Sequence, residues 1–202
     1  MCTKALFLVT LCTLWATPAL AELASICDQV PGNSVVNCGF EMGDFTRWAL
    51  SGNTSNPGGF YYGVDAIDAF SGNFGAYLGP LGAPLDLSQS LATQTGAEYS
   101  ISFWLEQDTL PTPGYVHDFS ASFGGLLLLS LVNPDTTGWI NYSFVETATS
   151  SMTPLQFSVR NDDTYWSFDD VSVSQVPEPS ATFLTGIVLC SLLALRRRVP
   201  RR

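Results

Sequence analysis

The sequence predicts an all-β protein: a two-sheet antiparallel β-sandwich with an N-terminal signal peptide and a single C-terminal transmembrane helix. Two observations predict the sandwich. Between residues 22 and 175, apolar and polar side chains alternate with a period of two in several short segments, and the 3.6-residue period of an α-helix is absent. Turn-forming pairs such as Gly124-Gly125 and Asn133-Pro134 separate these segments. Many short strands over about 150 residues are typical of two packed sheets.

Residues 1–21 have the organisation of a signal peptide. Lys4 supplies a positive charge, an apolar stretch follows it, and Ala19-Leu20-Ala21 has the small-x-small pattern that signal peptidase accepts. We expect cleavage after Ala21. The protein is therefore expected to be exported.

The last residues of the chain, 176–202, contain a short apolar segment. Its fifteen residues, Ala181–Leu195, would form a helix about 23 Å long, whereas a bilayer core is about 30 Å thick. The arginines that follow, Arg196, Arg197 and Arg198, would stop translocation and stay in the cytoplasm. With the N-terminal signal, this orientation places the domain outside the inner membrane. A lasting membrane anchor is the simplest interpretation of such a tail.

Three segments of the domain show the alternation most clearly. They are residues 99–107 (YSISFWLEQ), 117–123 (HDFSASF) and 155–161 (LQFSVRN). In each segment every second side chain is apolar, and most of its neighbours are polar, as expected of half-buried antiparallel strands. The side chains of Trp48 and Trp104 are expected in the core between the sheets.

The domain at residues 22–175 is strongly acidic. It contains seventeen Asp and Glu residues, no lysine, and only the two arginines Arg47 and Arg160, which gives a formal charge of −15. Such a charge opposes binding to nucleic acid and to anionic membrane surfaces. It is consistent with solubility, with cation binding and with neutral polysaccharides as neighbours.

Two cysteines remain in the exported domain. Cys2 and Cys12 leave with the signal peptide and Cys190 lies in the apolar tail, so Cys27 and Cys38 are the pair available in an oxidising compartment. We expect a disulfide between them. It would stabilise an unstrained fold by roughly 3 kcal/mol.

The tail resembles a PEP-CTERM sorting signal. The resemblance rests on Pro177-Glu178-Pro179, the short apolar span after it and the arginine cluster, in that order and spacing. It implies recognition in the inner membrane by an exosortase-type transpeptidase, removal of the tail, and delivery to the cell surface or beyond. It also implies a Gram-negative bacterium that makes extracellular polysaccharide. The tail is then a transient address at residues 176–202 rather than an anchor.

Most of the domain resembles the carbohydrate-binding-module-like, galactose-binding-type jelly rolls found on PEP-CTERM proteins. Residues 35–53, 87–105 and 155–173 resemble their opening, middle and closing strands, with an N-x-G-F-E opening and a D-D-V closing motif. The resemblance implies that the sandwich is a jelly roll. One departure is Cys38, where the family usually has a second glycine.

The same resemblance implies a structural calcium ion. In related jelly rolls the glutamate of the opening motif and an aspartate of the closing pair hold it, which corresponds to Glu41 and Asp169 here, with Asp170 as the substitute. Independently, Asp169 shares strand parity with Val171 and should point toward the core side, where a carboxylate needs a cation or donors. Calcium takes six to eight oxygen ligands. The alternative is that Arg47 or backbone amides satisfy these acids without a metal.

The sequence offers no constellation for nucleophilic catalysis, which needs an activated nucleophile beside a base. The only histidine, His117, opens a predicted strand and is expected to be a solvated edge residue. A glycosidase needs only two carboxylates across a cleft. Seventeen acidic residues are present in the domain, and no pair of them is marked out by the sequence.

Sugar recognition places aromatic faces beside hydrogen-bonding side chains. The candidates lie in loops: three in the glycine-rich stretch SNPGGFYYG, one in a second loop, and two beside Asp162-Asp163. The alternative for each is ordinary packing. These candidate ligand-binding residues are Phe60, Tyr61, Tyr62, Tyr115, Tyr165 and Trp166.

The predicted function is therefore non-catalytic binding of extracellular polysaccharide by an exosortase-sorted protein of the cell surface or matrix. One alternative is a structural or adhesive matrix protein without a sugar site, and another is a small glycan hydrolase. A sugar binder should show an aromatic-lined groove, a structural protein a flat apolar patch, and a hydrolase two carboxylates roughly 5–10 Å apart in a cleft.

Overall fold

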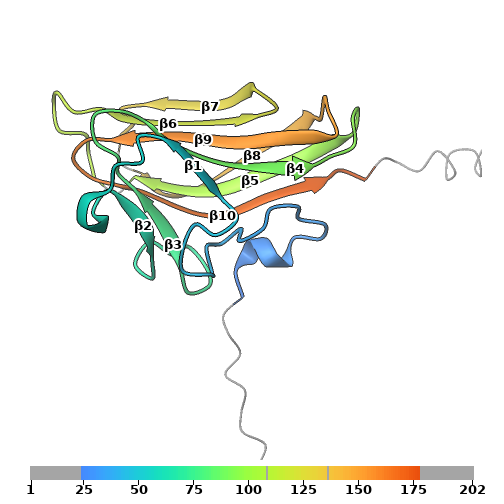
Figure 1. Cartoon of the computed structure of the whole chain (residues 1–202), viewed down its shortest axis with the longest axis horizontal. Coiled ribbons are helices and arrows are strands. Elements are labelled where there is room, and N and C mark those ends of the chain that lie inside the picture. The colour runs from blue at the N-terminus through green and yellow to red at the C-terminus, as the bar shows by residue number, and fades with distance from the viewer. Residues whose placement is uncertain (1–23, 108, 136, 178–202) are drawn as a thin grey trace, which may run out of the picture.

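The computed structural model describes residues 24–107, 109–135 and 137–177, which fold into two antiparallel five-stranded sheets packed face to face (Figure 1). This confirms the predicted all-β sandwich. Short 3-10 turns, η1 (Ile26–Gln29) and η2 (Pro57–Gly59), are the helical elements of the described chain. The segment with η1 lies against β10 on the outside of the lower sheet in Figure 1.

The two sheets have the strand orders β1-β4-β9-β6-β7 and β2-β3-β10-β5-β8, and every pairing is antiparallel. We call them the first and the second sheet. The strands of the first sheet are β1 (Ala49–Gly52), β4 (Leu85–Ala92), β9 (Met152–Asn161), β6 (His117–Phe123) and β7 (Leu126–Val132). Those of the second sheet are β2 (Tyr62–Asp65), β3 (Gly75–Leu78), β10 (Trp166–Gln175), β5 (Glu98–Gln107) and β8 (Thr137–Thr147).

The core lies between the sheets, where the alternating side chains of both meet. The predicted strands at residues 99–107, 117–123 and 155–161 appear as β5, β6 and most of β9, with their apolar side chains buried. At the centre, Phe103 contacts Phe157 with ring centroids 5.1 Å apart, and Phe157 contacts Phe168 at 4.7 Å. Because these rings come from β5, β9 and β10, they join the two sheets.

One of the two tryptophans expected in the core is not there. Trp48 is 7% exposed and belongs to the core, as predicted, but Trp104 is half-buried. Its neighbours Phe103 and Leu105 point inward, so the Trp104 side chain points out of the second sheet, where it stacks on Phe70 with centroids 3.7 Å apart. The alternation within β5 takes precedence over the general preference of tryptophan for burial.

The expectation that His117 is a solvated edge residue is also wrong. The side chain is fully buried, because β6 lies between β7 and β9 rather than at the edge of the sheet. Its ring Nε2 pairs with the Asp163 carboxylate, and its Nδ1 pairs with the side-chain amide of Gln107. These polar partners account for a histidine inside an otherwise apolar sandwich.

Asp169 does not point toward the core, as its alternation with Val171 predicts, because β10 contains a bulge. The register of β10 against β5 shifts between Asp169 and Ser172, and Asp170 has a φ of 52°. Asp169 pairs with Trp104, whose side chain points outward, so Asp169 lies on the outer side of the sheet. It is nevertheless fully buried, because the β2–β3 loop covers it and donates backbone N–H groups to it. A bulge of this kind re-aims side chains that simple alternation would place on the other face.

The predicted targeting segments lie outside the described residues. These are the signal peptide at residues 1–21, the apolar helix at 181–195 and the arginines 196–198. In the part of the chain that the structure describes, no helix has the length and apolar character needed to cross a membrane.

Candidate functional site

The outer face of the second sheet carries a tyrosine that lies across a glycine. Tyr77 of β3 pairs with Gly63 of β2, and a Cβ atom at residue 63 would lie 2.2 Å from the Tyr77 hydroxyl oxygen and 2.4 Å from Cζ. Such distances are inside van der Waals contact, so the ring occupies the space that any other side chain at residue 63 would fill. The Tyr77 hydroxyl donates a hydrogen bond to the Gly59 carbonyl at 2.8 Å. The hydroxyl end of the ring is therefore fixed both by its packing on Gly63 and by this hydrogen bond.

A second tyrosine is placed in the same way. Tyr165 immediately precedes β10, and a Cβ atom at Gly79 would lie 2.4 Å from the Thr164 carbonyl oxygen and 2.7 Å from Cδ1 of Tyr165. The Tyr165 hydroxyl donates to the Phe60 carbonyl at 2.6 Å. The rings of Tyr77 and Tyr165 meet edge to face, with centroids 5.5 Å apart and an interplanar angle of 88°. Both rings are thus fixed before any ligand arrives.

These rings form the walls of a pocket of about 310 Å³, which we call the tyrosine pocket. Phe60, at 69% exposed, and Ile67, at 89% exposed, stand at its rim on two different loops. Tyr165 is 40% exposed, so part of its surface is open to solvent. The volume is at the small end of the range for ligand sites. The full lining is Gly59, Phe60, Asp65, Ile67, Asp68, Tyr77 and Tyr165.

Two carboxylates also line the tyrosine pocket. Asp65 accepts backbone N–H groups from Ile67 at 2.8 Å and from Asp68 at 3.1 Å, and Asp68 accepts the hydroxyl of Ser167. Burial and, next, the charge of Asp65 raise the pKa of Tyr77, with smaller contributions from Tyr165 and Asp68. The described lining holds no lysine, arginine or histidine.

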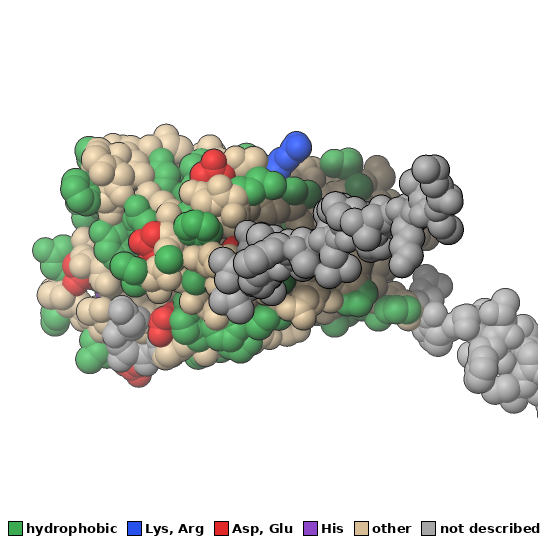
Figure 2. All heavy atoms as spheres, turned by 90° about the horizontal axis from the view of Figure 1, so that it is seen from below, with side chains coloured by type: hydrophobic (Ala, Val, Ile, Leu, Met, Phe, Trp, Pro, Cys, Tyr) green, Lys and Arg blue, Asp and Glu red, His purple; other side chains and the backbone are tan. Residues whose placement is uncertain are grey.

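Both acidic and apolar side chains surround the pocket. Figure 2 views the molecule from the side of the second sheet, and acidic side chains lie among apolar ones over the left half of that face. A smaller depression, of about 170 Å³, adjoins the pocket and shares Tyr165 with it. Tyr61, Asp162 and Asp163 contribute to this depression. Tyr165 therefore stands between two hollows on one continuous surface.

A further aromatic group lies elsewhere on the same sheet face. Phe70, from the β2–β3 loop, stacks on Trp104 and contacts Trp139 with centroids 5.3 Å apart. The loop that carries Phe70 also carries Asp68, so it links this group to the tyrosine pocket. Phe70, Trp104 and Trp139 are each partly buried, whereas Tyr165 is 40% exposed.

The six aromatic residues predicted to bind a ligand have different positions. Phe60 and Tyr165 line the tyrosine pocket, and Tyr61 lines the adjoining depression. Tyr62 packs against the core and donates its hydroxyl to the Thr54 carbonyl at 2.8 Å. Trp166 is 1% exposed, which leaves no ring face for a ligand.

The sixth, Tyr115, is 46% exposed in the loop between β5 and β6 and lines neither hollow. Sequence reasoning missed Tyr77, Asp65 and Asp68, although all three belong to the pocket. The sequence contains one indication of this site, the glycines Gly63 and Gly79, which leave room for two rings. It does not show which rings lie beside these glycines.

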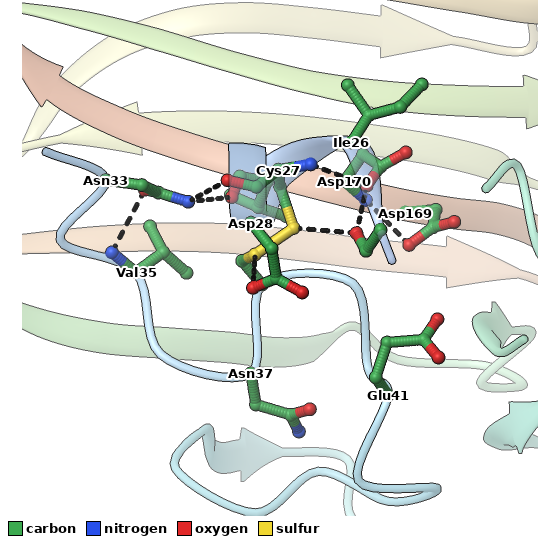
Figure 3. The surroundings of a disulfide bond; sticks show 12 residues. Ile26, Cys27, Asp28, Asn33, Val35, Asn37, Glu41, Asp169 and Asp170 are labelled. Atoms are coloured by element: carbon green, nitrogen blue, oxygen red, sulfur yellow. Dashed lines mark hydrogen bonds between the residues drawn. A yellow bond between two sulfur atoms is a disulfide. The ribbon is translucent and has the colours of Figure 1, made fainter. Parts of the chain in front are cut away.

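The predicted disulfide between Cys27 and Cys38 is confirmed, with Cα atoms 6.0 Å apart. Figure 3 shows the carboxylates of Asp28 and Asp170 close to it, with Glu41 on the loop that follows Cys38. Burial first, and then the charges of Glu41 and Asp170, raise the pKa of Asp28. The disulfide ties the N-terminal segment to this acidic region.

Backbone N–H groups and polar side chains donate hydrogen bonds to the three predicted calcium ligands. The Glu41 carboxylate accepts the N–H groups of Asn73 at 2.9 Å and Phe74 at 3.1 Å. Asp169 accepts those of Phe70 at 2.9 Å and Ser71 at 3.1 Å. Asp170 accepts from the Cys27 N–H at 3.1 Å, the Ser71 hydroxyl at 2.6 Å and the hydroxyl of Ser25.

The fit of this region to calcium is partial. Carboxylate oxygens are ligands that calcium prefers, and burial together with the adjacent charge of Asp170 raises the pKa of Asp169 to about 8. However, among the described residues the only group of three or more His, Cys, Asp or Glu side chains whose ligand atoms all lie within 4.8 Å of one another is Cys27, Asp28 and Cys38. The two sulfur atoms of that group form the disulfide. Glu41, Asp169 and Asp170 do not converge in this way, so the calcium site stays a prediction.

Comparison with known proteins places this domain by its fold. No family model and no curated protein matches the sequence. Among solved structures, the module TmCBM61 in complex with β-1,4-galactotriose is 22% identical, with a TM-score of 0.53 over 71% of this chain and 99% of that chain. The domain has the jelly-roll fold of a carbohydrate-binding module.

Two other solved structures are similar. The enzymatically active domain of tailspike protein 4 from bacteriophage CBA120 is 16% identical, with a TM-score of 0.52 over 71% of this chain but only 21% of that chain. The CBM22-1 xylan-binding domain of Xyn10C from Paenibacillus barcinonensis is 15% identical, with a TM-score of 0.48 over 69% of this chain and 92% of that chain. At such identities the likeness to TmCBM61 and to the tailspike domain concerns the fold.

Proposed function

We propose that this protein binds a polysaccharide outside the cell, without catalysis, in the tyrosine pocket. One observation carries the proposal: Tyr77 and Tyr165 are held across glycines, with their hydroxyls tied to a loop, beside two carboxylates. Aromatic faces pack against the apolar faces of sugar rings, and carboxylates accept hydrogen bonds from sugar hydroxyls. The fold, shared with carbohydrate-binding modules, supports the same proposal.

The rigidity of the pocket favours binding by weak contacts. Ordering a flexible side chain on association costs about 0.5–1.5 kcal/mol. The rings of Tyr77 and Tyr165 already lie against the backbone at Gly63 and Gly79, and both hydroxyls are hydrogen-bonded, so these side chains lose little freedom when a glycan binds. Phe60 and Ile67 at the rim can then add apolar contact around the sugar.

The pattern of the two chain ends supports a proposed location. We infer export through the signal peptide, passage through the inner membrane, and sorting by an exosortase-type transpeptidase that recognises Pro177-Glu178-Pro179 and the tail after it. The processed protein then works at the surface of a Gram-negative bacterium or in its extracellular matrix. The intact mass of the mature protein from its host tests this: a mass ending near Pro179 supports sorting, and a mass that retains Arg202 contradicts it.

One observation favours the structural or adhesive alternative. Strand β7 lies at the edge of the first sheet and has the sequence LLLLSLV, with Leu126 54%, Leu127 61% and Val132 67% exposed. An exposed apolar edge strand is suited to pairing with another chain. A role in protein contacts would therefore use β7, on a different sheet from the tyrosine pocket.

The binding proposal is tested by a glycan screen with two matched variants. Tyr165→Ala removes a wall of the pocket, whereas Tyr115→Ala removes a similarly exposed tyrosine of the β5–β6 loop that lines neither hollow. We expect the glycan that the wild type binds to be bound at least tenfold more weakly by Tyr165→Ala and unchanged by Tyr115→Ala. Equal affinity of all three proteins would contradict the site, and release of reducing sugar from the glycan would favour the hydrolase alternative.

A further inference from the structure

The tyrosine pocket and the depression beside it share one wall. Tyr165 lines both the pocket, of about 310 Å³, and the depression, of about 170 Å³. Sites for drug-sized ligands have volumes of about 300–1,000 Å³. Each hollow therefore suits a group of about the size of one sugar, and a longer ligand has to extend from one hollow into the other.

The depression repeats the chemistry of the tyrosine pocket. Beside Tyr165, the side chains of Tyr61 and Leu81 give it apolar surface, and Leu81 is 46% exposed. Its polar lining comes from the end of β9 and the β9–β10 loop, namely Asn161, Asp162, Asp163 and Thr164. Apolar surface beside hydrogen-bonding side chains is the combination that a sugar ring needs.

The carboxylates of the depression are paired within the protein. Asp162 accepts two hydrogen bonds from Arg160, at 2.8 and 2.6 Å, and Asp163 pairs with His117. The formal charge of −15 on residues 22–175 also repels anionic ligands. A neutral ligand with hydroxyl groups therefore fits the depression better than an anion or a cation.

One buried donor in the depression has no partner among the described residues. Asn161 is 1% exposed, and its Oδ1 accepts the N–H group of Thr164 at 3.0 Å, whereas its Nδ2 has no acceptor in this part of the chain. A buried donor without an acceptor is costly. A sugar hydroxyl at the floor of the depression would supply the acceptor, so this donor points to a ligand that enters the depression as well as the pocket.

We propose that the protein binds two consecutive sugars of a linear, neutral polysaccharide, one on either side of Tyr165. One sugar lies in the tyrosine pocket against Phe60 and Tyr165. Its neighbour in the chain lies in the depression against Leu81, where a hydroxyl oxygen accepts from Asn161. This inference rests on the proposed function, because it adds a second part to the same site and names the ligand as a chain of at least two sugars.

The test measures how affinity depends on the length of the ligand. The purified protein is titrated with glucose, mannose, galactose and xylose and with the β-1,4-linked dimer, trimer and tetramer of each, by NMR for weak ligands and by calorimetry for tighter ones. In the series that binds, we expect the dimer to bind at least about tenfold more tightly than the monomer, because it fills both hollows. The trimer and the tetramer should each add less than about threefold.

Variants assign the two sugars to the two hollows. Leu81→Ala removes apolar surface from the depression, and Ile67→Ala removes it from the rim of the tyrosine pocket. Leu110→Ala is the matched control, because Leu110 is 59% exposed in the β5–β6 loop and lines neither hollow. We expect Leu81→Ala to bind the dimer about three- to tenfold more weakly and the monomer unchanged. Ile67→Ala should weaken both ligands, and Leu110→Ala neither.

The outcomes distinguish this inference from the function on which it rests. A dimer that binds no more tightly than the monomer, an affinity that rises as steeply again at the trimer and tetramer, or a Leu81→Ala variant that behaves like Leu110→Ala would overturn the two-sugar inference. Carbohydrate binding that Tyr165→Ala still weakens would then leave the proposed function standing. If no sugar of the panel binds, or if Tyr165→Ala binds the oligomers as tightly as the wild type, both proposals are overturned.

Discussion

The glycine beneath Tyr77 offers a sharp test of how the pocket is built. In a Gly63→Ala variant the new methyl group would lie 2.2 Å from the Tyr77 hydroxyl oxygen and 2.7 Å from Cε1. Ordinary contacts begin well beyond these distances, so the Tyr77 ring must move. It would lose the 2.8 Å hydrogen bond to Gly59 and its edge-to-face contact with Tyr165.

The expected cost follows from these two contacts. A hydrogen bond contributes about 1 kcal/mol, and an aromatic pair about 0.5–1.5 kcal/mol. We therefore expect the free energy of unfolding to fall by about 2 kcal/mol, which lowers the midpoint of thermal unfolding by about 4–8 °C in a domain of this size. Binding of the glycan should weaken at least tenfold, although every aromatic side chain is still present.

Two further variants make this reasoning refutable. Gly138→Ala adds the same methyl group in β8, where nothing lies within 4 Å of the new Cβ, and should leave stability and binding nearly unchanged. In a Tyr77→Ala background, Gly63→Ala should cost nothing further, because the clash is gone. If Gly63→Ala behaves like Gly138→Ala, or if its cost persists without Tyr77, the pocket is not held together as described.

Three other predictions concern the scaffold. Replacing Cys27 and Cys38 together by serine should lower stability by about 3 kcal/mol, measured by denaturant unfolding without reductant; a change below about 1 kcal/mol would contradict a stabilising role. The hydrogen bond from Arg160 lowers the pKa of Asp162 to about 2 from 3.8. Since the folded-state pKa is the lower one, the stabilisation is present above about pH 4 and is lost as the pH falls through about 2. Asp162→Asn should therefore lose about 1–2 kcal/mol of stability at pH 7 and almost none below about pH 2, and a pH-independent difference would refute the assignment. Calcium at about 10 mM should raise the unfolding midpoint by about 3–10 °C, and Asp169→Asn should remove the effect; a midpoint that calcium does not move would contradict the calcium prediction.

The fold could be predicted because its signal is local. The alternation at residues 99–107 is visible in neighbouring residues of the sequence. It also predicts the observed position of Trp104, which lies on the same face of the strand as Ser100 and Ser102 and on the opposite face from Phe103. The expectation that Trp104 lies in the core, which follows from its residue type, is therefore wrong. The periodicity of a strand was here a better guide than residue type.

The site could be predicted only in part, because its residues are joined by pairings that the sequence does not show. Phe60 and Tyr165 were found as loop aromatics, but Tyr77 lies inside a short strand, and its role depends on the register that sets it opposite Gly63. The bulge in β10 is likewise invisible in the sequence, and it moved Asp169 to the other side of the sheet. Registers and bulges are set by tertiary packing.

The most direct test of the central claim is a crystal structure of the protein with the oligosaccharide that it binds most tightly. The account predicts a sugar ring in the tyrosine pocket, packed against Tyr165 and Phe60 and within hydrogen-bond distance of Asp65 or Asp68. A sugar bound on the first sheet, or one that contacts Trp139 and leaves Tyr165 free, would contradict it.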